Sequence, residues 1–263
     1  MLEVAAVLGA VVSGAAYLTA VRVSRPRGWP RHRTALFLTG LGCAVLATVG
    51  PLARAAHHDF PAHVTTHLLV AMAAPLLLVR AAPVTLALRA LPIRGARGLS
   101  RVLGTRAVRW LTEPVVAVVL DLGGLWVFYR RGLLAATHTS ELLHVVTHAH
   151  MFTAGVLFTI AIIGVDPMPH RRSFTHRAAV LLTATAAHGI LTKTLYVSPP
   201  VGVGVGEAET GAKIMYYGGD VIEVAMMVVL CAAWYRSRLR STGRARTPSA
   251  SRTLGLPHGR STP

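Results

Sequence analysis

Two pairs of histidines in this chain have a spacing that suits metal binding. His63 and His67 are four residues apart, and so are His144 and His148. On an α-helix, residues at this spacing lie one above the other on the same face. Two such pairs on two helices offer four nitrogen ligands, a set that suits copper or zinc and that can also hold haem iron. We therefore predict a metal site formed by these four histidines.

Further polar residues accompany the histidine pairs inside apolar stretches. Asp220 and Glu223 are three residues apart and so share a helix face. Carboxylates beside ligand histidines commonly orient the imidazole and set its tautomer. We assign a supporting role to an additional polar layer made of Asp121, His188, Met215, Asp220 and Glu223.

Other interpretations of these residues stay open. An internal ion pair between Asp121 and Lys193 would explain both without any function. A histidine pair near a helix end also fits the polar boundary of a membrane without binding metal. Three further histidines fall in connecting segments, where we expect them to be solvated: His57, His58 and His138.

The composition indicates a membrane protein. The chain has 263 residues, of which 53% are hydrophobic and 14% charged, and its mean hydropathy is +0.53. Soluble domains carry about 25% charged residues, because their surface must be polar. The formal net charge of +17 raises the possibility of a nucleic-acid partner. The arginines, however, stand between long apolar runs and not on one polar face, so we exclude that partner.

Seven apolar stretches are long enough to cross a hydrocarbon core of about 30 Å as helices of about 20 residues. We therefore expect an all-α, polytopic membrane protein with seven transmembrane helices in one domain, residues 1–235. Residues 236–263 are rich in Arg, Ser, Thr, Pro and Gly and predict a basic, disordered cytoplasmic tail. The expected spans are roughly Leu2–Val21, Thr34–Leu52, His63–Leu88, Val108–Tyr129, His144–Val165, Ala178–Val197 and Ala212–Tyr235.

The arginines predict the orientation of these spans. They concentrate after the first, third, fifth and seventh stretches. Positively charged segments stay in the cytoplasm, so the N-terminus is predicted outside and the C-terminus in the cytoplasm. At a rise of about 1.5 Å per residue, each histidine pair begins at the outer end of its span, with Asp121, His188 and Asp220 about 12–15 Å deep. The polar layer is thus predicted in the outer half of the bilayer.

Three segments carry a resemblance to a known family. The first runs from His63-Val-Thr-Thr-His67 into an apolar stretch broken by Pro75, and the second is His144-Val-Val-Thr-His148 followed by Met151. The third extends from Gly211 through Met215-Tyr-Tyr-Gly-Gly-Asp220 to Glu223. In these segments the chain resembles the CtaG-type family of cytochrome c oxidase assembly factors. The resemblance implies a multi-helix membrane protein that assists the assembly of haem–copper oxidase at copper insertion, with oxidase subunits as partners.

The leading interpretation is an assembly factor of the bacterial plasma membrane that holds copper in an outer histidine site. Transfer would proceed by ligand exchange, and the lack of thiolate ligands fits a site that releases its ion. We expect no enzymatic activity, because the His-Glu-x-x-His string of zinc hydrolases is absent. One alternative is a redox protein with b-type haem between the histidine pairs. Another is a metal or proton transporter with a relay through Asp121, Asp220 and Glu223.

Overall fold

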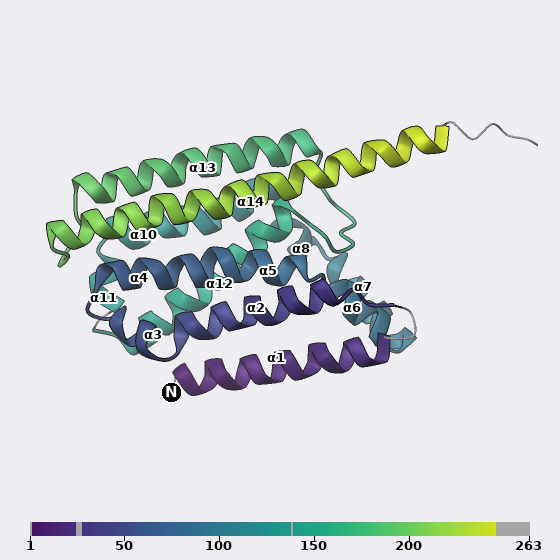
Figure 1. Cartoon of the computed structure of the whole chain (residues 1–263), viewed down its shortest axis with the longest axis horizontal. Coiled ribbons are helices and arrows are strands. Elements are labelled where there is room, and N and C mark those ends of the chain that lie inside the picture. The colour runs from purple at the N-terminus through teal and green to yellow at the C-terminus, as the bar shows by residue number, and fades with distance from the viewer. Residues whose placement is uncertain (1, 25–27, 138, 246–263) are drawn as a thin grey trace, which may run out of the picture. The chain divides into compact units, whose positions relative to one another are not determined.

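The apolar stretches form long helices in the computed structural model of the chain (Figure 1). The structure describes residues 2–24, 28–137 and 139–245, and the regular structure in these ranges is entirely helical, which confirms the all-α prediction. Met1–Leu230 form one unit and Cys231–Pro263 a second. In chain order the helices are α1 Leu2–Ser24, α2 Arg31–Thr48, α3 Pro51–Ala55, α4 Phe60–His67, η2 Leu68–Ala73, α5 Ala74–Arg80, α6 Pro83–Ala90, α7 Ile93–Leu103, α8 Arg106–Leu111, α9 Pro114–Val118, η3 Val119–Gly123, α10 Gly124–Arg130, α11 Leu133–Thr137, α12 Glu141–Ile162, α13 Phe174–Val197 and α14 Val205–Ala245.

Within the described residues, six helices are long and apolar enough to cross a membrane. They correspond to the first, second, third, fifth, sixth and seventh predicted spans. These six apolar helices support a membrane protein with several spanning helices, whereas the fourth predicted span, and with it the total of seven, and the orientation stay predictions. The six candidates are Ala6–Ser24, Arg31–Ala55, Phe60–Arg80, Glu141–Ile162, Phe174–Val197 and Val205–Leu239.

The predicted fourth span, Val108–Tyr129, is interrupted near its start. Helix α8 ends at Leu111, and a new helix begins at Pro114. Proline fits the first turn of a helix, where its missing N–H is not needed. From Pro114 the chain stays helical through η3 to Arg130, a shorter run than the sequence pattern suggested and not among the six candidate spans. Glu113 lies in the break, outside this helical run.

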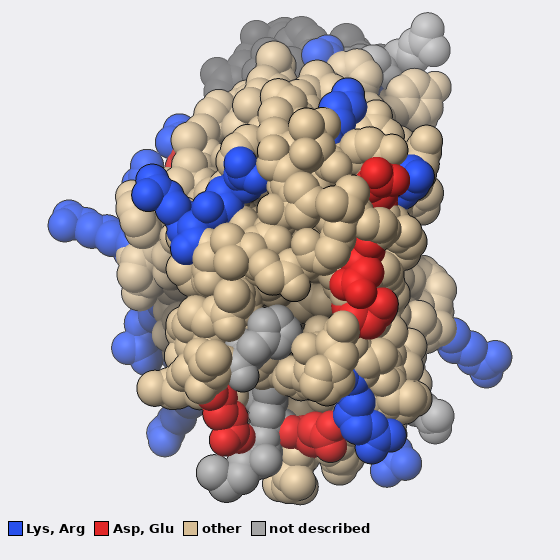
Figure 2. Space-filling model, turned by 90° about the vertical axis from the view of Figure 1, so that its left-hand side faces the viewer, with Lys and Arg blue, Asp and Glu red and all other residues tan. Residues whose placement is uncertain are grey.

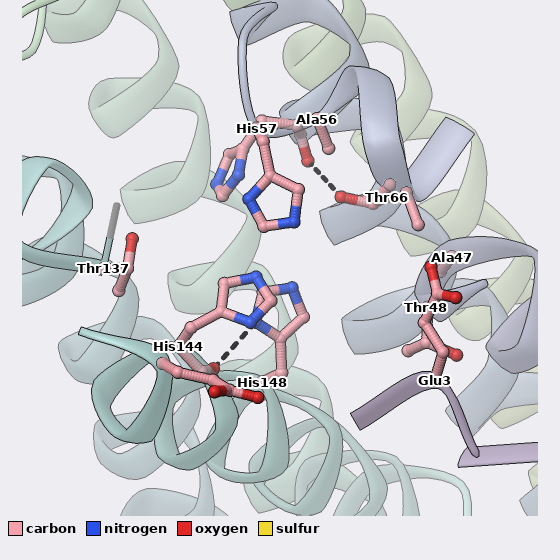
Figure 3. Close-up of a pocket in the computed structure, with 12 residues that line it drawn as sticks. Glu3, Ala47, Thr48, Ala56, His57, Thr66, Thr137, His144 and His148 are labelled. Carbon is pink, nitrogen blue, oxygen red and sulfur yellow. Dashed lines mark hydrogen bonds between the residues drawn. The ribbon is translucent and has the colours of Figure 1, made fainter. Parts of the chain in front are cut away.

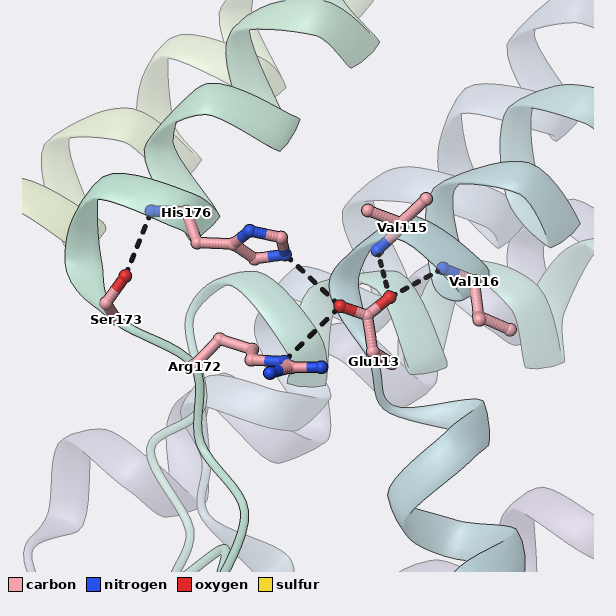
Figure 4. A network of polar contacts seen from close by, with 6 residues as sticks. All are labelled: Glu113, Val115, Val116, Arg172, Ser173 and His176. Atoms are coloured by element: carbon pink, nitrogen blue, oxygen red, sulfur yellow. Dashed lines mark hydrogen bonds and ion pairs between the residues drawn. The ribbon is translucent and has the colours of Figure 1, made fainter.

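Glu113 ties the break to two other segments (Figure 4). Its Oε2 accepts hydrogen bonds from the backbone N–H groups of Val115 at 2.8 Å and Val116 at 3.1 Å, which caps α9. Its Oε1 lies 3.5 Å from Nε of Arg172 and 3.2 Å from Nε2 of His176. Burial raises the pKa of Glu113, but the two backbone bonds, His176 and the charge of Arg172 together outweigh burial and lower that pKa below its ordinary value.

Two of the helical runs contain π-helical turns. The turn η2 directly follows His67, and the turn η3 contains Asp121. A π-helical turn is rare, and it occurs frequently at functional sites because it re-aims the side chains around it. These turns therefore direct attention to the interior of the bundle next to His67 and Asp121.

Close packing fixes α12 against the third span. A Cβ added at Gly155 of α12 would collide with the backbone carbonyl oxygen of Ala71 in η2, so only glycine fits there. Nearby, an apolar core gathers Val64, Phe128 and Met215, which are at most 2% exposed. These contacts hold the two helices that carry the predicted histidine pairs.

Helix α14 continues beyond the point where the sequence predicted disorder. The prediction placed the start of the tail at Arg236, but the helix extends to Ala245. The side chain of Arg236 folds back on this helix, and its Nε donates to the backbone carbonyl oxygen of Ala232 at 3.1 Å. Residues 236–245 contain no proline to end the helix. The rest of the predicted tail, 246–263, lies outside the described residues.

Candidate metal-binding pocket

A pocket of about 220 Å³ at one end of the first unit is lined by four imidazoles (Figure 3). His57 comes from the segment after α3, and His63 comes from α4. His144 and His148 come from the first two turns of α12. These four side chains surround the histidine pocket. Three of the four predicted ligands, His63, His144 and His148, therefore lie around one space.

The imidazole rings approach one another across the pocket. The ring centroids of His144 and His148 are 4.2 Å apart, and those of His57 and His144 are 5.0 Å apart. In Figure 3 the rings of His144 and His148 extend from α12 toward His57. His63 is only 8% exposed and stacks on Phe128, with ring centroids 5.6 Å apart. The pocket thus has accessible imidazoles at its mouth and a buried one at its wall.

A backbone hydrogen bond sets the tautomer of His148. Nδ1 of His148 lies 3.0 Å from the carbonyl oxygen of His144. Since a carbonyl oxygen only accepts hydrogen bonds, Nδ1 carries the proton and donates it. The neutral ring then has its lone pair on Nε2, the nitrogen free to bind a metal ion. This pattern, in which one ring nitrogen is fixed by a hydrogen bond, is common among metal-bound histidines.

Carboxylates lie close to the same pocket. Glu3 of α1 and Glu141 of α12 are among the residues that line it. Figure 2, which views the end of the molecule that is on the left in Figure 1, shows acidic as well as basic side chains on a largely uncharged face. Carboxylates at a pocket raise the local concentration of cations, so their position favours the approach of a metal ion.

The side chains in the histidine pocket are not yet arranged as a coordination sphere. Within residues 2–24, 28–137 and 139–245, no three His, Cys, Asp or Glu side chains are placed to hold one metal ion. Coordination therefore requires rotation of imidazole rings. His57 is exposed, and exposed side chains change rotamer within nanoseconds, whereas His144 and His148 are half-buried.

His67 does not line the histidine pocket. It lines a separate cavity of about 40 Å³, together with Asp121, His188 and Glu223. These four side chains surround the inner chamber. Two methionines, Met72 and Met226, also line it, and its wall includes residues of both π-helical turns. The two members of the first histidine pair thus belong to different cavities, one turn of helix apart.

The inner chamber contains polar atoms that lack partners in the protein. Nδ1 of His188 lies 2.9 Å from Oε1 of Glu223, and both side chains are buried. Both ring nitrogens of His67, Nε2 of His188 and Oε2 of Glu223 are buried without a hydrogen-bond partner. An unmet buried polar group costs about 1–3 kcal/mol. A polar cavity of 40 Å³ has room for roughly one or two water molecules that would satisfy these atoms.

The remaining predicted residues lie elsewhere. Met215 is fully buried in the apolar core, and the half-buried Asp220 lines neither cavity. Nζ of Lys193 lies 5.7 Å from the ring centroid of Tyr216, in a cation–π contact. Among the described side chains it forms no ion pair with Asp121. His138 lies outside the described residues.

His57 was not among the four predicted ligands, and we expected it to be solvated. His57 is exposed, yet the turn between α3 and α4 brings its ring against His144. The turn ends at Asp59, whose side chain caps α4 by accepting a hydrogen bond from the N–H of Ala62 at 2.7 Å. The sequence did contain a signal for this contact, because His57 stands two residues before Asp59, the N-cap of the helix that carries His63.

The curated relatives that match are mycobacterial proteins named as uncharacterized. Those of Mycobacterium bovis and Mycobacterium tuberculosis are each 30% identical over 187 residues, which is 68% of this chain and 28% of theirs. One of Mycobacterium leprae is 27% identical over 250 residues, 86% of this chain and 38% of its own. The chain thus spans well under half the length of these relatives. No solved structure matches it.

A family comparison agrees with the resemblance noted from the sequence. The family described as cytochrome c oxidase caa3 assembly factor, CtaG, matches residues 15–237. The match includes both histidine pairs and all the residues that line the inner chamber. It covers most of the chain, and the chain therefore belongs to the cytochrome c oxidase caa3 assembly factor family.

Proposed function

We propose that the protein assists the assembly of cytochrome c oxidase in a bacterial plasma membrane by capturing copper in the histidine pocket. Membership of the family supports the assembly role and an association with the oxidase. The observation that carries the copper role is the arrangement of His148. Its Nδ1 is engaged by the carbonyl oxygen of His144, so its Nε2 is available next to the rings of His144 and His57.

The ligand set that we propose differs by one residue from the set predicted by spacing. His63, His144 and His148 remain, and His57 replaces His67, which lines the inner chamber instead. Neutral imidazoles suit copper in either common oxidation state. Their different exposure suggests an order, in which the exposed His57 meets the ion first and His63 binds it last.

The proposed site favours exchange over storage. The free cysteines Cys43 and Cys231 are not among the residues that line the pocket. Without thiolates, the site binds Cu(I) less tightly and can release the ion to an oxidase subunit by ligand exchange. The distribution of arginines supports a pocket on the outer side of the membrane. The protein acts in this proposal as a carrier and not as a catalyst.

Copper affinity of the purified full-length chain in detergent tests the proposal. The test variant is His144→Ala/His148→Ala, and the control is His58→Ala/His150→Ala, which removes two nearby exposed histidines that do not line the pocket. Competition with a chromophoric chelator should show that the test variant binds copper at least about tenfold more weakly, whereas the control stays close to wild type. Oxidase activity in membranes of cells that depend on each variant should follow the same order.

Two results would contradict the proposal. The first is a test variant that keeps wild-type copper affinity and supports full oxidase activity. The second is a Soret absorbance band with stoichiometric haem in the purified protein, which would favour the haem-carrying alternative. Circular dichroism and gel filtration of all variants show whether each is folded before affinities are compared.

A further inference from the structure

A larger cavity lies at the other end of the first unit, away from the histidine pocket. Its volume is about 730 Å³, and it lies between the start of α2, helices α6 and α7, and the segment joining α12 to α13. In Figure 1 the labels α6 and α7 stand at the end opposite to α3 and α11. Four candidate spans have an end near this cavity. Two of them end at Ser24 and Ile162, and the other two begin at Arg31 and Phe174. The cavity is therefore at the boundary between the membrane and water.

Three arginines line this cavity, the arginine cleft: Arg33, Arg89 and Arg171. The ring of Trp29 holds two of them, with the guanidinium carbons of Arg33 and Arg89 at 5.1 and 5.6 Å from the ring centroid. The indole N–H of Trp29 donates to the hydroxyl of Tyr17 at 3.3 Å, which fixes the ring. Two positive charges are thus held close together on one platform.

One carboxylate, Asp166, lines the same cleft but is directed into α6. Its Oδ1 accepts hydrogen bonds from the N–H of Thr85 at 2.7 Å and from the hydroxyl of Thr85 at 2.6 Å. Its Oδ2 accepts from the N–H of Val84 at 3.3 Å. These bonds satisfy the start of α6, where a negative charge is favourable. The three arginines therefore leave the cleft with an excess of positive charge.

The rest of the cleft and the adjoining helix α7 are apolar on one side. Leu88, Leu103 and Val165 line the cleft beside the arginines. Helix α7 exposes Ile93 and Val102 by 71% and 56%. At 100° per residue, Arg94, Arg97 and Arg101 share one side of α7, and Leu99 and Leu103 share the opposite side. Ile93 and Val102 lie at the two margins between these sides. Such a helix is typical of the membrane surface, where its apolar side contacts acyl chains and its arginines face headgroups.

We propose that the arginine cleft binds an anionic phospholipid, with the lipid phosphate held by Arg33, Arg89 and Arg171. Guanidinium groups bind phosphate oxygens through paired, charge-assisted hydrogen bonds. Basic pockets between membrane helices commonly hold anionic headgroups in this way. The phosphate meets the excess positive charge, and Leu88, Leu103 and Val165 contact the glycerol and the upper acyl chains. The proposal is independent of copper capture.

Lipid binding to the purified full-length chain in a zwitterionic detergent tests this proposal. Native mass spectrometry would count bound phosphatidylglycerol and phosphatidylcholine during titration. The test variant Arg33→Gln/Arg89→Gln/Arg171→Gln and the control Arg94→Gln/Arg97→Gln/Arg101→Gln lose the same charge, but only the first alters the cleft. We expect phosphatidylglycerol to bind the test variant at least about tenfold more weakly than wild type, and the control to stay within about twofold.

If phosphatidylglycerol binding were weakened equally in both triple variants, the proposed site in the arginine cleft would be wrong, and the effect would come from diffuse surface charge. Equal binding of phosphatidylglycerol and phosphatidylcholine to wild type would overturn the preference for an anionic lipid. Displacement of phosphatidylglycerol by millimolar inorganic phosphate would show a site for free phosphate and contradict a lipid. If the triple variant does not fold, Arg171→Gln leaves the Trp29 contacts intact and is compared with Arg97→Gln, with the same order expected.

Discussion

The histidine pocket and the inner chamber contain the same kinds of side chain in opposite surroundings. The pocket has exposed His57 and half-buried His144 and His148, with room of about 220 Å³. The chamber has His188 and Glu223 at 5% and 6% exposure, with room of about 40 Å³. His63 and His67, one turn apart on one helix, belong to the two cavities respectively.

This difference separates a site for exchange from a site for structure. In the pocket, water can replace any lost partner, so side chains rotate and ions exchange at low cost. In the chamber, each polar atom depends on the protein or on enclosed water, because the surrounding medium is apolar. We therefore expect substitutions in the chamber to affect folding, and substitutions in the pocket to affect binding.

The largest effect is expected from Glu223→Leu in the inner chamber. The substitution leaves His188 buried without its partner, and loss of one member of a buried pair lowers the free energy of unfolding by about 3–5 kcal/mol. In the histidine pocket, Glu141→Leu should change the free energy of unfolding by less than about 0.5 kcal/mol, because Glu141 is exposed. Thermal unfolding in detergent, followed by circular dichroism, measures both.

The double variant His188→Leu/Glu223→Leu serves as the control for this comparison. It removes both polar groups and leaves no orphan, so it should recover much of the stability lost in the single variant. Similar melting temperatures for Glu223→Leu, Glu141→Leu and wild type would contradict the distinction between the two cavities.

The second largest effect is expected from Gly155→Ala, which tests the packing between α12 and η2. A methyl group at Gly155 meets the carbonyl oxygen of Ala71, a residue that also lines the chamber. We expect Gly155→Ala to lower the free energy of unfolding by about 1–3 kcal/mol. Gly42→Ala, where a Cβ has open space, should be neutral or stabilising by up to about 1 kcal/mol. Equal melting temperatures of the two variants would show that the close approach is not needed.

Much of the fold followed from the sequence because length and hydropathy determine it. Six of the seven apolar stretches are long helices, and the break before Pro114 could have been inferred from the proline itself. Helical spacing correctly placed His144 and His148 beside each other. Depth was the missing information, because the same spacing did not show that His67 lies in another cavity.

Contacts between distant segments were also beyond the sequence. His57 follows α3 and His144 belongs to α12, yet the fold brings their ring centroids to 5.0 Å. Met215 was assigned a supporting role in the additional polar layer, but helix packing directs it into the apolar core. Asp121 and Lys193 looked like partners, yet Lys193 contacts Tyr216. Each of these outcomes depends on which helices adjoin, and periodicity within one helix does not contain that information.

A third prediction concerns acid and the histidine pocket. A metal ion binds the neutral imidazole and therefore competes with protons for the ring nitrogen. The ordinary pKa of the histidine side chain is about 6.5. We expect copper affinity of wild type to fall about tenfold or more between pH 7.5 and pH 5.5, measured by chelator competition. The residual binding of His144→Ala/His148→Ala should depend less on pH. A pH-independent affinity in wild type would contradict imidazole ligands.

The smallest effect extends the comparison to a carboxylate at the membrane boundary, Glu113. Its pKa is lowered from 4.5, so its ionised form stabilises the fold above that value, and this contribution is lost as the pH falls through the lower pKa of the folded state. Glu113→Gln keeps an oxygen that can accept the capping hydrogen bonds but removes the negative charge, which should lower the free energy of unfolding by about 1 kcal/mol at pH 7. The difference in free energy of unfolding between Glu113→Gln and wild type should become smaller as the pH falls below 4.5. Glu207→Gln, at an exposed position, is the control. If Glu113→Gln and wild type differed in free energy of unfolding by the same amount at pH 7 and at acidic pH, the charge of Glu113 would contribute nothing to stability.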